Sequence, residues 1–189
     1  MKLITNIIIT ISILLSVYYM YLHLVPVDIN RISLGVVSLL LLVIPILIEK
    51  FSKIKIEKYV KLIYYFFLLI SFILGVLFQL YYSTYFFDLI VHGLFGLLLS
   101  IIIGTKLKSN SWMNFFLLLS IVIFIGFIWE SLEFFSDVFM RTDHQEKISG
   151  AKDTMTDLLM SMVGTMIYSV YVLIENKIKN KLHNIIDIS

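Results

Sequence analysis

Six long apolar segments, separated by short polar ones, dominate this sequence. They lie at 3–25, 32–48, 60–82, 85–103, 112–135 and 154–174. Each has about 17 to 25 residues, the length that a helix needs to cross the hydrocarbon core of a bilayer. Hydrophobic residues make up 60% of the chain, well above the roughly 45–50% of an average soluble domain. The sequence therefore predicts an all-α polytopic membrane helix bundle with six transmembrane helices, and a single integral membrane domain over residues 1–189.

The chain contains no cysteine and carries a formal net charge of +2. Without thiols, a disulfide framework, a thiolate metal site and a cysteine nucleophile are all excluded. No basic patch with interleaved aromatic residues is present, so nucleic acid is not an expected partner. The expected partner is the lipid bilayer, and the sequence leaves the oligomeric state open.

Two of the six segments need separate interpretation. The first follows Lys2 and resembles a secretory signal, but it is too long for the apolar core of a signal and lacks a small-residue cleavage motif before Pro26. We therefore expect a retained helix. The second is short and contains Pro45, a helix breaker that membranes tolerate when neighbouring groups satisfy the freed backbone.

The lysine and arginine residues divide unequally between the two faces that six spans create. One face collects eleven of the fifteen, including the run "EKFSKIKIEKYVK" at 49–61; the other collects Arg31, Arg141, Lys147 and Lys152. Because short loops rich in basic residues stay in the cytoplasm, both termini are predicted to be cytoplasmic. The lysine run also fits an amphipathic sensor of anionic lipids, although a topological anchor is the simpler interpretation.

Ionisable side chains at membrane depth concentrate in the last three spans. In "YFFDLIVHGLFGLLLS", Asp88 and His92 are four residues apart, so they share one helix face. Gly96 and Ser100 continue that face at the same spacing. A face made of small and charged residues is expected to pack inward, because small residues allow close helix approach and charged residues avoid lipid.

The fifth and sixth spans carry matching acidic faces. On the fifth, an i, i+3, i+7 progression places three acids on one stripe: Glu130, Glu133 and Asp137. On the sixth, Asp153 and Asp157 are four residues apart, on a face that Ser161 and Gly164 continue. The predicted topology brings these acids, with Asp88 and His92, to the extracytoplasmic ends of their spans. They can converge there on one pocket.

Structural explanations account for part of this pattern. An acid at the start of a helix, such as Asp153 and in part Asp88, is explained by capping or by the helix macrodipole. Asp137 is expected in headgroup water. The loop residues Asp143, His144 and Glu146 are expected to be solvated. Clustered carboxylates repel one another, and three neighbouring cations could compensate them in a purely structural network: Arg141, Lys147 and Lys152.

A divalent metal site is the functional alternative to this structural network. Carboxylate oxygens with one imidazole suit Mg²⁺, Mn²⁺, Zn²⁺ or Fe²⁺, and these helical spacings aim ligands at one point in a bundle. The expected metal ligands are Asp88, His92, Glu130, Glu133, Asp153 and Asp157, and the expected catalytic residues are Glu130, Glu133 and Asp157. These are enough ligands for two ions, which suit hydrolysis or group transfer on a lipid-linked or cell-envelope substrate. Cation- or proton-coupled transport through the same acids is the remaining alternative.

Three motif blocks support the grouping of these residues. "FDLIVHGLFG", "WESLEFFSD" and "DTMTDLLMSMVG" resemble, in order and approximate spacing, those of the YjdF-like family of bacterial inner-membrane proteins. The family pattern falls on Asp88, His92, Trp129, Glu130, Glu133, Asp153, Thr154 and Asp157. The resemblance implies a multi-pass protein of the bacterial plasma membrane and one shared site, without naming a reaction. A looser likeness is to the VanZ-like family, whose middle block differs from Glu130 and Glu133.

Overall fold

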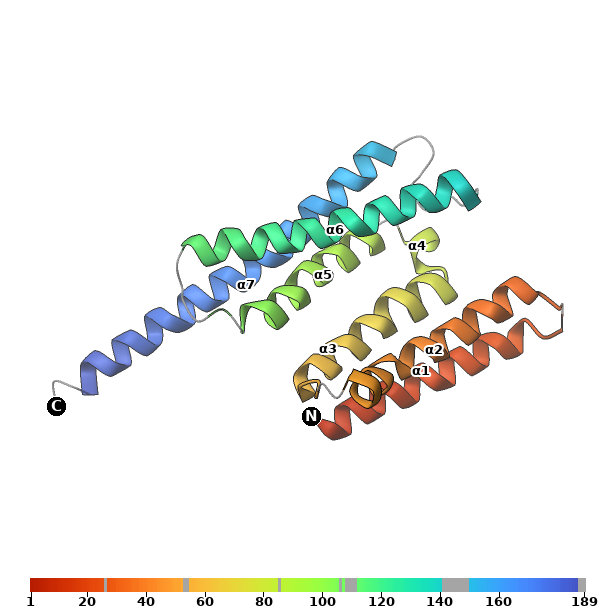
Figure 1. Cartoon of the computed structure of the whole chain (residues 1–189), viewed down its shortest axis with the longest axis horizontal. Helices are drawn as coiled ribbons and strands as arrows, with labels where there is room; N and C mark the ends of the chain where they lie inside the picture. Colours follow the sequence, from red (N-terminus) through yellow and green to blue (C-terminus); the bar gives the residue numbers. More distant parts are fainter. Residues whose placement is uncertain are drawn as a thin grey trace. The chain divides into compact units, whose positions relative to one another are not determined.

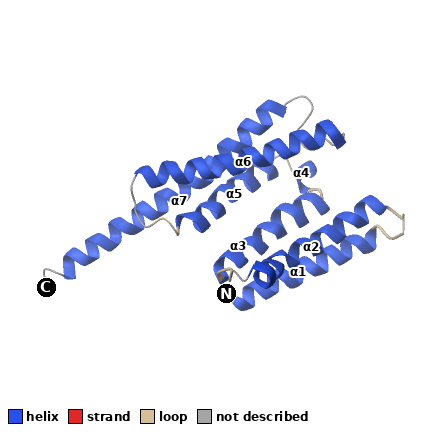
Figure 2. Cartoon of the chain, viewed as in Figure 1, coloured by secondary structure: helices blue, strands red, loops and turns tan. Residues whose placement is uncertain are grey.

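A computed structural model shows a chain built from helices. It describes residues 1–25, 27–52, 55–84, 86–105, 107, 112–140 and 150–186, and no strand occurs among them (Figure 2). The chain divides into two compact units, Met1–Phe87 and Asp88–Ser189, which are described separately below. Whether they act as the single domain that the sequence predicts stays a prediction.

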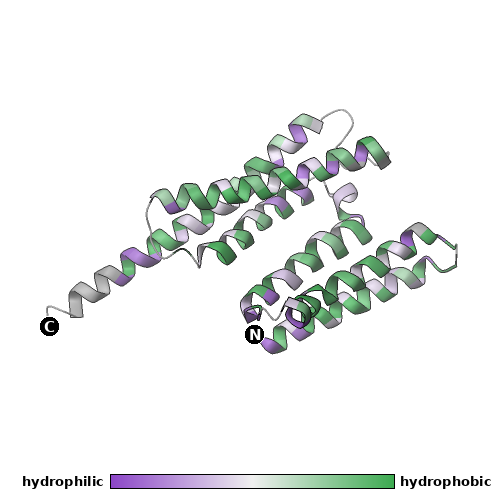
Figure 3. Cartoon of the chain, in the orientation of Figure 1, coloured by the Kyte–Doolittle hydropathy of each residue, from purple (hydrophilic) through white to green (hydrophobic). Residues whose placement is uncertain are grey.

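Six helices are long and apolar enough to cross a membrane, which confirms the predicted fold class. They cover Lys2–Leu22, Arg31–Ser52, Lys58–Leu77, Phe87–Gly104, Trp112–Phe139 and Gly150–Lys179. Figure 3 shows predominantly hydrophobic residues along most of each helix. Large apolar side chains are exposed on both units, and such surfaces imply contact with bilayer lipid.

The first unit contains three spans, which begin with α1 (Lys2–Leu22) and α2 (Ile29–Ser52). The third span is made of α3 (Lys58–Leu68) and the π-helix η1 (Leu69–Leu77), and the short helix α4 (Leu80–Ser83) follows it. In Figure 1 this third span runs alongside α1 and α2. Two clusters of buried apolar residues join these helices: Tyr19, Ile73 and Leu77 in one, and Leu42, Tyr65 and Leu68 in the other.

The third span ends at Leu77, five residues before the predicted end at Tyr82. Gln79 takes a left-handed conformation with φ of 59°, and this reverses the local helical path before α4. The ring of Tyr81 then lies where a Cβ atom on Gly75 would be, so that a larger residue at this position would require the ring to move. The turn therefore places Tyr81 back against the π-helix.

Pro45 lies inside α2, and a neighbouring helix provides the hydrogen-bond donor that the proline removes. Proline has no N–H group, so the carbonyl oxygen of Leu41, four residues earlier, loses its helical donor. Tyr64 of α3 donates its hydroxyl to this oxygen at 2.8 Å, and Tyr65 donates to the next carbonyl, that of Leu42, at 3.3 Å. The tyrosine pair therefore both satisfies α2 and joins it to α3.

At the end of α2 the carboxylate of Glu49 organises the turn to α3. One oxygen accepts a hydrogen bond from Lys61 Nζ at 2.6 Å, and the other accepts one from the main-chain nitrogen of Ile56 at 2.9 Å. The charge of Lys61, one of the lysines in the run 49–61, is thereby paired with that of Glu49 within the first unit.

The second unit consists of α5 (Phe87–Gly104), α6 (Trp112–Met140) and α7 (Gly150–Ile186). Figure 1 shows α6 and α7 running together, with α5 beside them. Backbones of α5 and α7 touch at two glycines: a Cβ atom on Gly96 would overlap the main-chain oxygen of Ser161, and one on Gly164 would overlap that of Gly93. A hydrogen bond of 3.1 Å from Ser100 to Thr165 extends this seam.

Candidate metal centre

The first turns of α5 provide an acid and an imidazole. Asp88 lies in the first turn, where the helix macrodipole favours a negative charge. His92 follows one turn later and is 8% exposed. Gly96 and Ser100, further along the same face, are also buried. The predicted stripe therefore exists, and its small residues bring α7 against it.

Asp157 of α7 faces this stripe. Its side chain is 1% exposed. One turn further, Ser161 donates its hydroxyl to the main-chain oxygen of His92 at 3.3 Å. This bond and the contact at Gly96 fix the two helices against each other directly beside the Asp157 carboxylate.

Glu130 of α6, the third helix of this unit, adds a further carboxylate beside His92. Its side chain is 2% exposed, and both carboxylate oxygens are buried. Oε1 lies 3.7 Å from Nε2 of His92. A carboxylate from each of two helices thus reaches the imidazole of the third.

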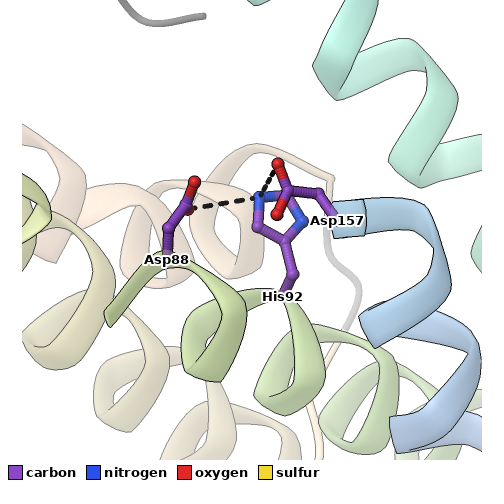
Figure 4. A group of neighbouring side chains, drawn as sticks. All are labelled: Asp88, His92 and Asp157. Atoms are coloured by element: carbon purple, nitrogen blue, oxygen red, sulfur yellow. Dashed lines mark ion pairs between the residues drawn. The ribbon is translucent and has the colours of Figure 1, made fainter. Parts of the chain in front are cut away.

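Three carboxylates surround one imidazole nitrogen. Nε2 of His92 lies 3.5 Å from Asp88 Oδ1, 3.7 Å from Glu130 Oε1 and 3.9 Å from Asp157 Oδ2. Figure 4 shows the carboxylates of Asp88 and Asp157 both directed at the same ring nitrogen. These separations exceed a good N–H···O hydrogen bond of about 2.9 Å. They come close to the roughly 3.4 Å between two ligands of a tetrahedral ion with bonds of about 2.1 Å.

Ligand atoms of Asp88, His92 and Asp157 all lie within 4.8 Å of one another. Two of these three residues are buried, whereas the Asp88 side chain is 36% exposed. Asp157 Oδ1 has no hydrogen-bond partner among the described residues. His92 and Asp157 therefore form the buried floor of the group, and Asp88 is its more open acid. Asp157 Oδ1 is available to a further ligand.

Glu133 and Asp153 lie around this floor. The carboxylate of Glu133 is close enough to interact electrostatically with Glu130, Asp88 and Asp153. Trp129, one turn earlier on α6, donates its indole N–H to Glu133 Oε1 at 2.7 Å. Of the six residues that the sequence predicts as ligands, Asp88, Glu130 and Asp157 lie 3.5–3.9 Å from Nε2 of His92, whereas Glu133 and Asp153 are linked to these acids only by electrostatic interaction. Their roles as ligands or catalytic groups stay predictions.

The predicted cationic partners are only partly described. Arg141 and Lys147, like Asp143, His144 and Glu146, lie outside the described residues. Lys152 is exposed at the start of α7. Within the described part of the chain, no lysine or arginine forms an ion pair with Asp88 or Asp157.

One polar residue of this region was not predicted from the sequence. Thr165 is fully buried and joins α7 to Ser100 of α5. Its position four residues after Ser161 on the same face of α7 was the available signal. The bond between Trp129 and Glu133 was also missed, although their i, i+4 spacing makes such a pair possible.

Comparison with known proteins gives the chain a family. A search of curated proteins and a search of solved structures found no significant match. A family model described as "Predicted membrane protein (DUF2238)" matches residues 7–177. The likeness to the VanZ-like family gains no support from this match, which covers the three motif blocks and most of the remaining chain. The chain therefore belongs to the DUF2238 family of predicted membrane proteins.

Proposed function

We propose that this protein binds a divalent metal ion between α5, α6 and α7 and uses it for hydrolysis or group transfer on a lipid-linked or cell-envelope substrate. The ligands are Asp88, His92, Glu130 and Asp157. One observation carries the proposal: a buried imidazole nitrogen faces three carboxylates from three helices at 3.5–3.9 Å. We identify the YjdF-like resemblance with the matched family, and place the protein in the bacterial plasma membrane.

The burial of the acids supports a bound cation. Asp157 and Glu130 are almost fully inaccessible to solvent, and carboxylates at membrane depth are costly unless a positive charge compensates them. A divalent ion would provide that charge and would coordinate Asp157 Oδ1, which has no hydrogen-bond partner among the described residues. One nitrogen and several carboxylate oxygens suit Zn²⁺, Mn²⁺ or Fe²⁺ better than Ca²⁺, which prefers oxygen ligands alone.

The depth of the site supports a substrate from the headgroup region. Trp112 and Trp129 of α6 are 77% and 54% exposed, and tryptophan is enriched where a span meets the membrane interface. Their separation of 17 residues corresponds to about 26 Å of helix, close to the roughly 30 Å of a hydrocarbon core. Glu130 therefore lies beside one interface, which lipid headgroups can reach.

In this scheme Glu130 and Asp157 would hold the ion, which would supply Lewis-acid chemistry when bound: it would polarise a substrate oxygen and lower the pKa of a water. Glu133, at the side of the cluster and oriented by Trp129, accepts the proton of the attacking water. The water oxygen bonds to the substrate phosphorus or carbonyl carbon as the bond to the leaving group breaks, and Glu133 returns the proton to the leaving group.

Metal analysis of the purified protein tests the proposal. Wild type reconstituted with Mn²⁺ or Zn²⁺ and then desalted is expected to retain the metal, and Glu130→Ala is expected to lose it. Asp137→Asn, on the same stripe of α6 but two turns beyond Glu130, is the matched control and is expected to retain it. A wild type that binds neither ion would overturn the proposal.

Activity is tested separately on the loaded protein. Phosphate release from a lipid phosphate, such as phosphatidic acid in mixed micelles, is expected with wild type and absent with Glu133→Gln. Equal rates for the two proteins would remove Glu133 as the base. No release from lipid phosphates, and no hydrolysis of lipid-linked esters, would contradict the hydrolase assignment.

A second candidate function is cation transport, because buried hydroxyls continue from the cluster along the seam between α5 and α7. Ser161, Ser100 and Thr165 are all fully buried, and Ser100 donates to Thr165. In proteoliposomes, transport predicts metal or proton flux that Asp157→Asn abolishes. Absence of flux in wild type would eliminate this candidate.

A further inference from the structure

We propose that the turn between α2 and α3 forms a binding surface for the phosphate headgroups of acidic phospholipids. The surface consists of three exposed lysines, Lys50, Lys55 and Lys58, with the aromatic side chain of Phe51. These four residues make up the basic turn. It belongs to the first unit and uses no residue of the metal centre, so it goes beyond the proposed function.

The first argument is the concentration of positive charge. Residues 49–61 contain five lysines and two glutamates, which gives this segment a net charge of +3. The formal net charge of the whole chain is +2, so the positive excess of the protein lies entirely here. Clusters of roughly four to eight basic residues next to a membrane span attract acidic headgroups. The segment therefore carries the charge that such lipids require.

The second argument is the order of the turn. The carboxylate of Glu49 accepts hydrogen bonds from Lys61 Nζ at 2.6 Å and from the main-chain nitrogen of Ile56 at 2.9 Å. One acid thus joins the end of α2, the segment before α3 and the beginning of α3. This contact holds the turn in a defined conformation and uses the charge of only one lysine, Lys61.

The third argument is that the other lysines remain available. Lys50, Lys55 and Lys58 are exposed, and none of them forms an ion pair with an acid in the part of the chain that the structure describes. Lys55 is within electrostatic reach of Glu49, whose carboxylate already accepts two hydrogen bonds. A lysine without an acid partner binds a phosphate group as a point charge.

The fourth argument is the depth of the basic turn. One candidate span ends at Ser52 and the next begins at Lys58, so the turn lies where two spans leave the hydrocarbon core. Phe51 is 76% exposed, and the ammonium group of Lys50 lies 5.8 Å from the centroid of its ring, within the range of about 6 Å for a cation–π contact. Interfacial lipid binders likewise combine basic groups in the headgroup layer with aromatic side chains at the acyl-chain boundary.

Native mass spectrometry of the full chain, purified in a neutral detergent, tests the proposal. Phosphatidylglycerol and phosphatidylcholine with identical acyl chains are titrated separately, so that only the headgroup differs. Wild type is expected to bind phosphatidylglycerol about tenfold more tightly, since each lysine near acidic headgroups contributes up to about fivefold in affinity. A triple variant that combines Lys50→Gln, Lys55→Gln and Lys58→Gln is expected to lose this preference.

The matched control removes the same charge elsewhere on the face that is predicted to be cytoplasmic. It combines substitutions at three other exposed lysines, Lys2→Gln, Lys177→Gln and Lys179→Gln, and is expected to keep the preference. Equal losses in the two triple variants would overturn the proposal, because net charge alone would then attract the lipid. Equal binding of the two lipids by wild type would overturn it as well.

Glu49→Ala separates an ordered surface from simple attraction of charge. The variant is more positive by one charge and loses both contacts that hold the turn. An ordered turn predicts weaker binding of phosphatidylglycerol than in wild type, whereas tighter binding would overturn the role of the turn. Circular dichroism and size-exclusion profiles identify a variant that fails to fold, and the triple variants give a reading that does not depend on Glu49.

Inorganic phosphate distinguishes a lipid from a free anion. Millimolar phosphate is expected to leave phosphatidylglycerol bound, because the lipid is also held by its acyl chains beside Phe51. Displacement of the lipid by phosphate would assign the basic turn to a soluble anion and overturn the proposal. Binding of Mn²⁺ by the second unit is expected to be the same in the wild type and both triple variants, so this test and that of the metal centre can fail separately.

Discussion

The main-chain oxygen of Ser161 lies where a Cβ atom on Gly96 would have to be. This direct contact between the backbones of α5 and α7 lies one turn from both His92 and Asp157, and Ser161 also donates to the main-chain oxygen of His92. The distance between the imidazole and the Asp157 carboxylate is therefore set by a glycine.

Gly96→Ala is expected to separate α5 from α7 and to weaken Mn²⁺ binding at least tenfold. The added methyl group meets backbone, which cannot rotate away, so we expect a loss of about 1–3 kcal/mol in stability. Thermal unfolding in detergent and Mn²⁺ titration measure the two effects. Gly93→Ala is the matched control, because its Cβ atom would lie 3.5 Å from the flexible end of Met160. Equal affinities for the two variants would show that this contact does not position the ligands.

Tyr64→Phe is expected to destabilise the first unit by about 1–2 kcal/mol, because the Leu41 carbonyl is left without a donor. Pro45→Ala supplies the missing helical N–H, so Tyr64→Phe should cost less in that background. A double-mutant cycle on unfolding free energies is expected to give a coupling of about 1 kcal/mol. Tyr82→Phe, at an exposed tyrosine, serves as control. Additive effects of the two substitutions would refute the compensation.

The sequence predicted much of the fold and of the site because both depend on periodicity. Apolar segments of spanning length identified six helices, and spacings of three and four residues grouped the acids with His92. The sequence also predicted that neighbouring groups would satisfy the backbone carbonyl freed by Pro45. The donor is Tyr64, which lies 23 residues along the chain from the Leu41 carbonyl that it satisfies, and no local pattern identifies a partner at that distance.

Other features escaped prediction for similar reasons. The π-helix at Leu69–Leu77 is apolar except for Ser71, so its composition does not distinguish it from the α-helix that precedes it. The left-handed residue that ends this span is Gln79 rather than glycine, which removed the usual sequence signal for a turn. The backbone contact at Gly96 depends on how two helices cross, and a small-residue face indicates such a crossing without giving its partner.

Trp129→Phe is expected to lower the rate of lipid-phosphate hydrolysis about fivefold while leaving the fold and Mn²⁺ binding intact. The substitution keeps an aromatic side chain at the interface and removes only the N–H that orients Glu133, a loss of roughly 1 kcal/mol. Trp112→Phe, at the other end of α6, is the control, since its ring contacts that of Phe115. An unchanged rate of hydrolysis in Trp129→Phe would mean that Glu133 does not need this bond to act as the base.

The predicted orientation places the acidic cluster on the extracytoplasmic side, and the natural absence of cysteine makes it testable. Lys55→Cys lies in the basic segment after α2, and Gln145→Cys lies between the fifth and sixth spans. Because the lysine-rich face is expected inside, an impermeant maleimide added to intact cells should label Gln145→Cys. Lys55→Cys should react only after permeabilisation. Lys108→Cys, between the fourth and fifth spans, should behave like Lys55→Cys. Labelling of Lys55→Cys in intact cells would invert the topology and move the metal centre to the cytoplasmic side.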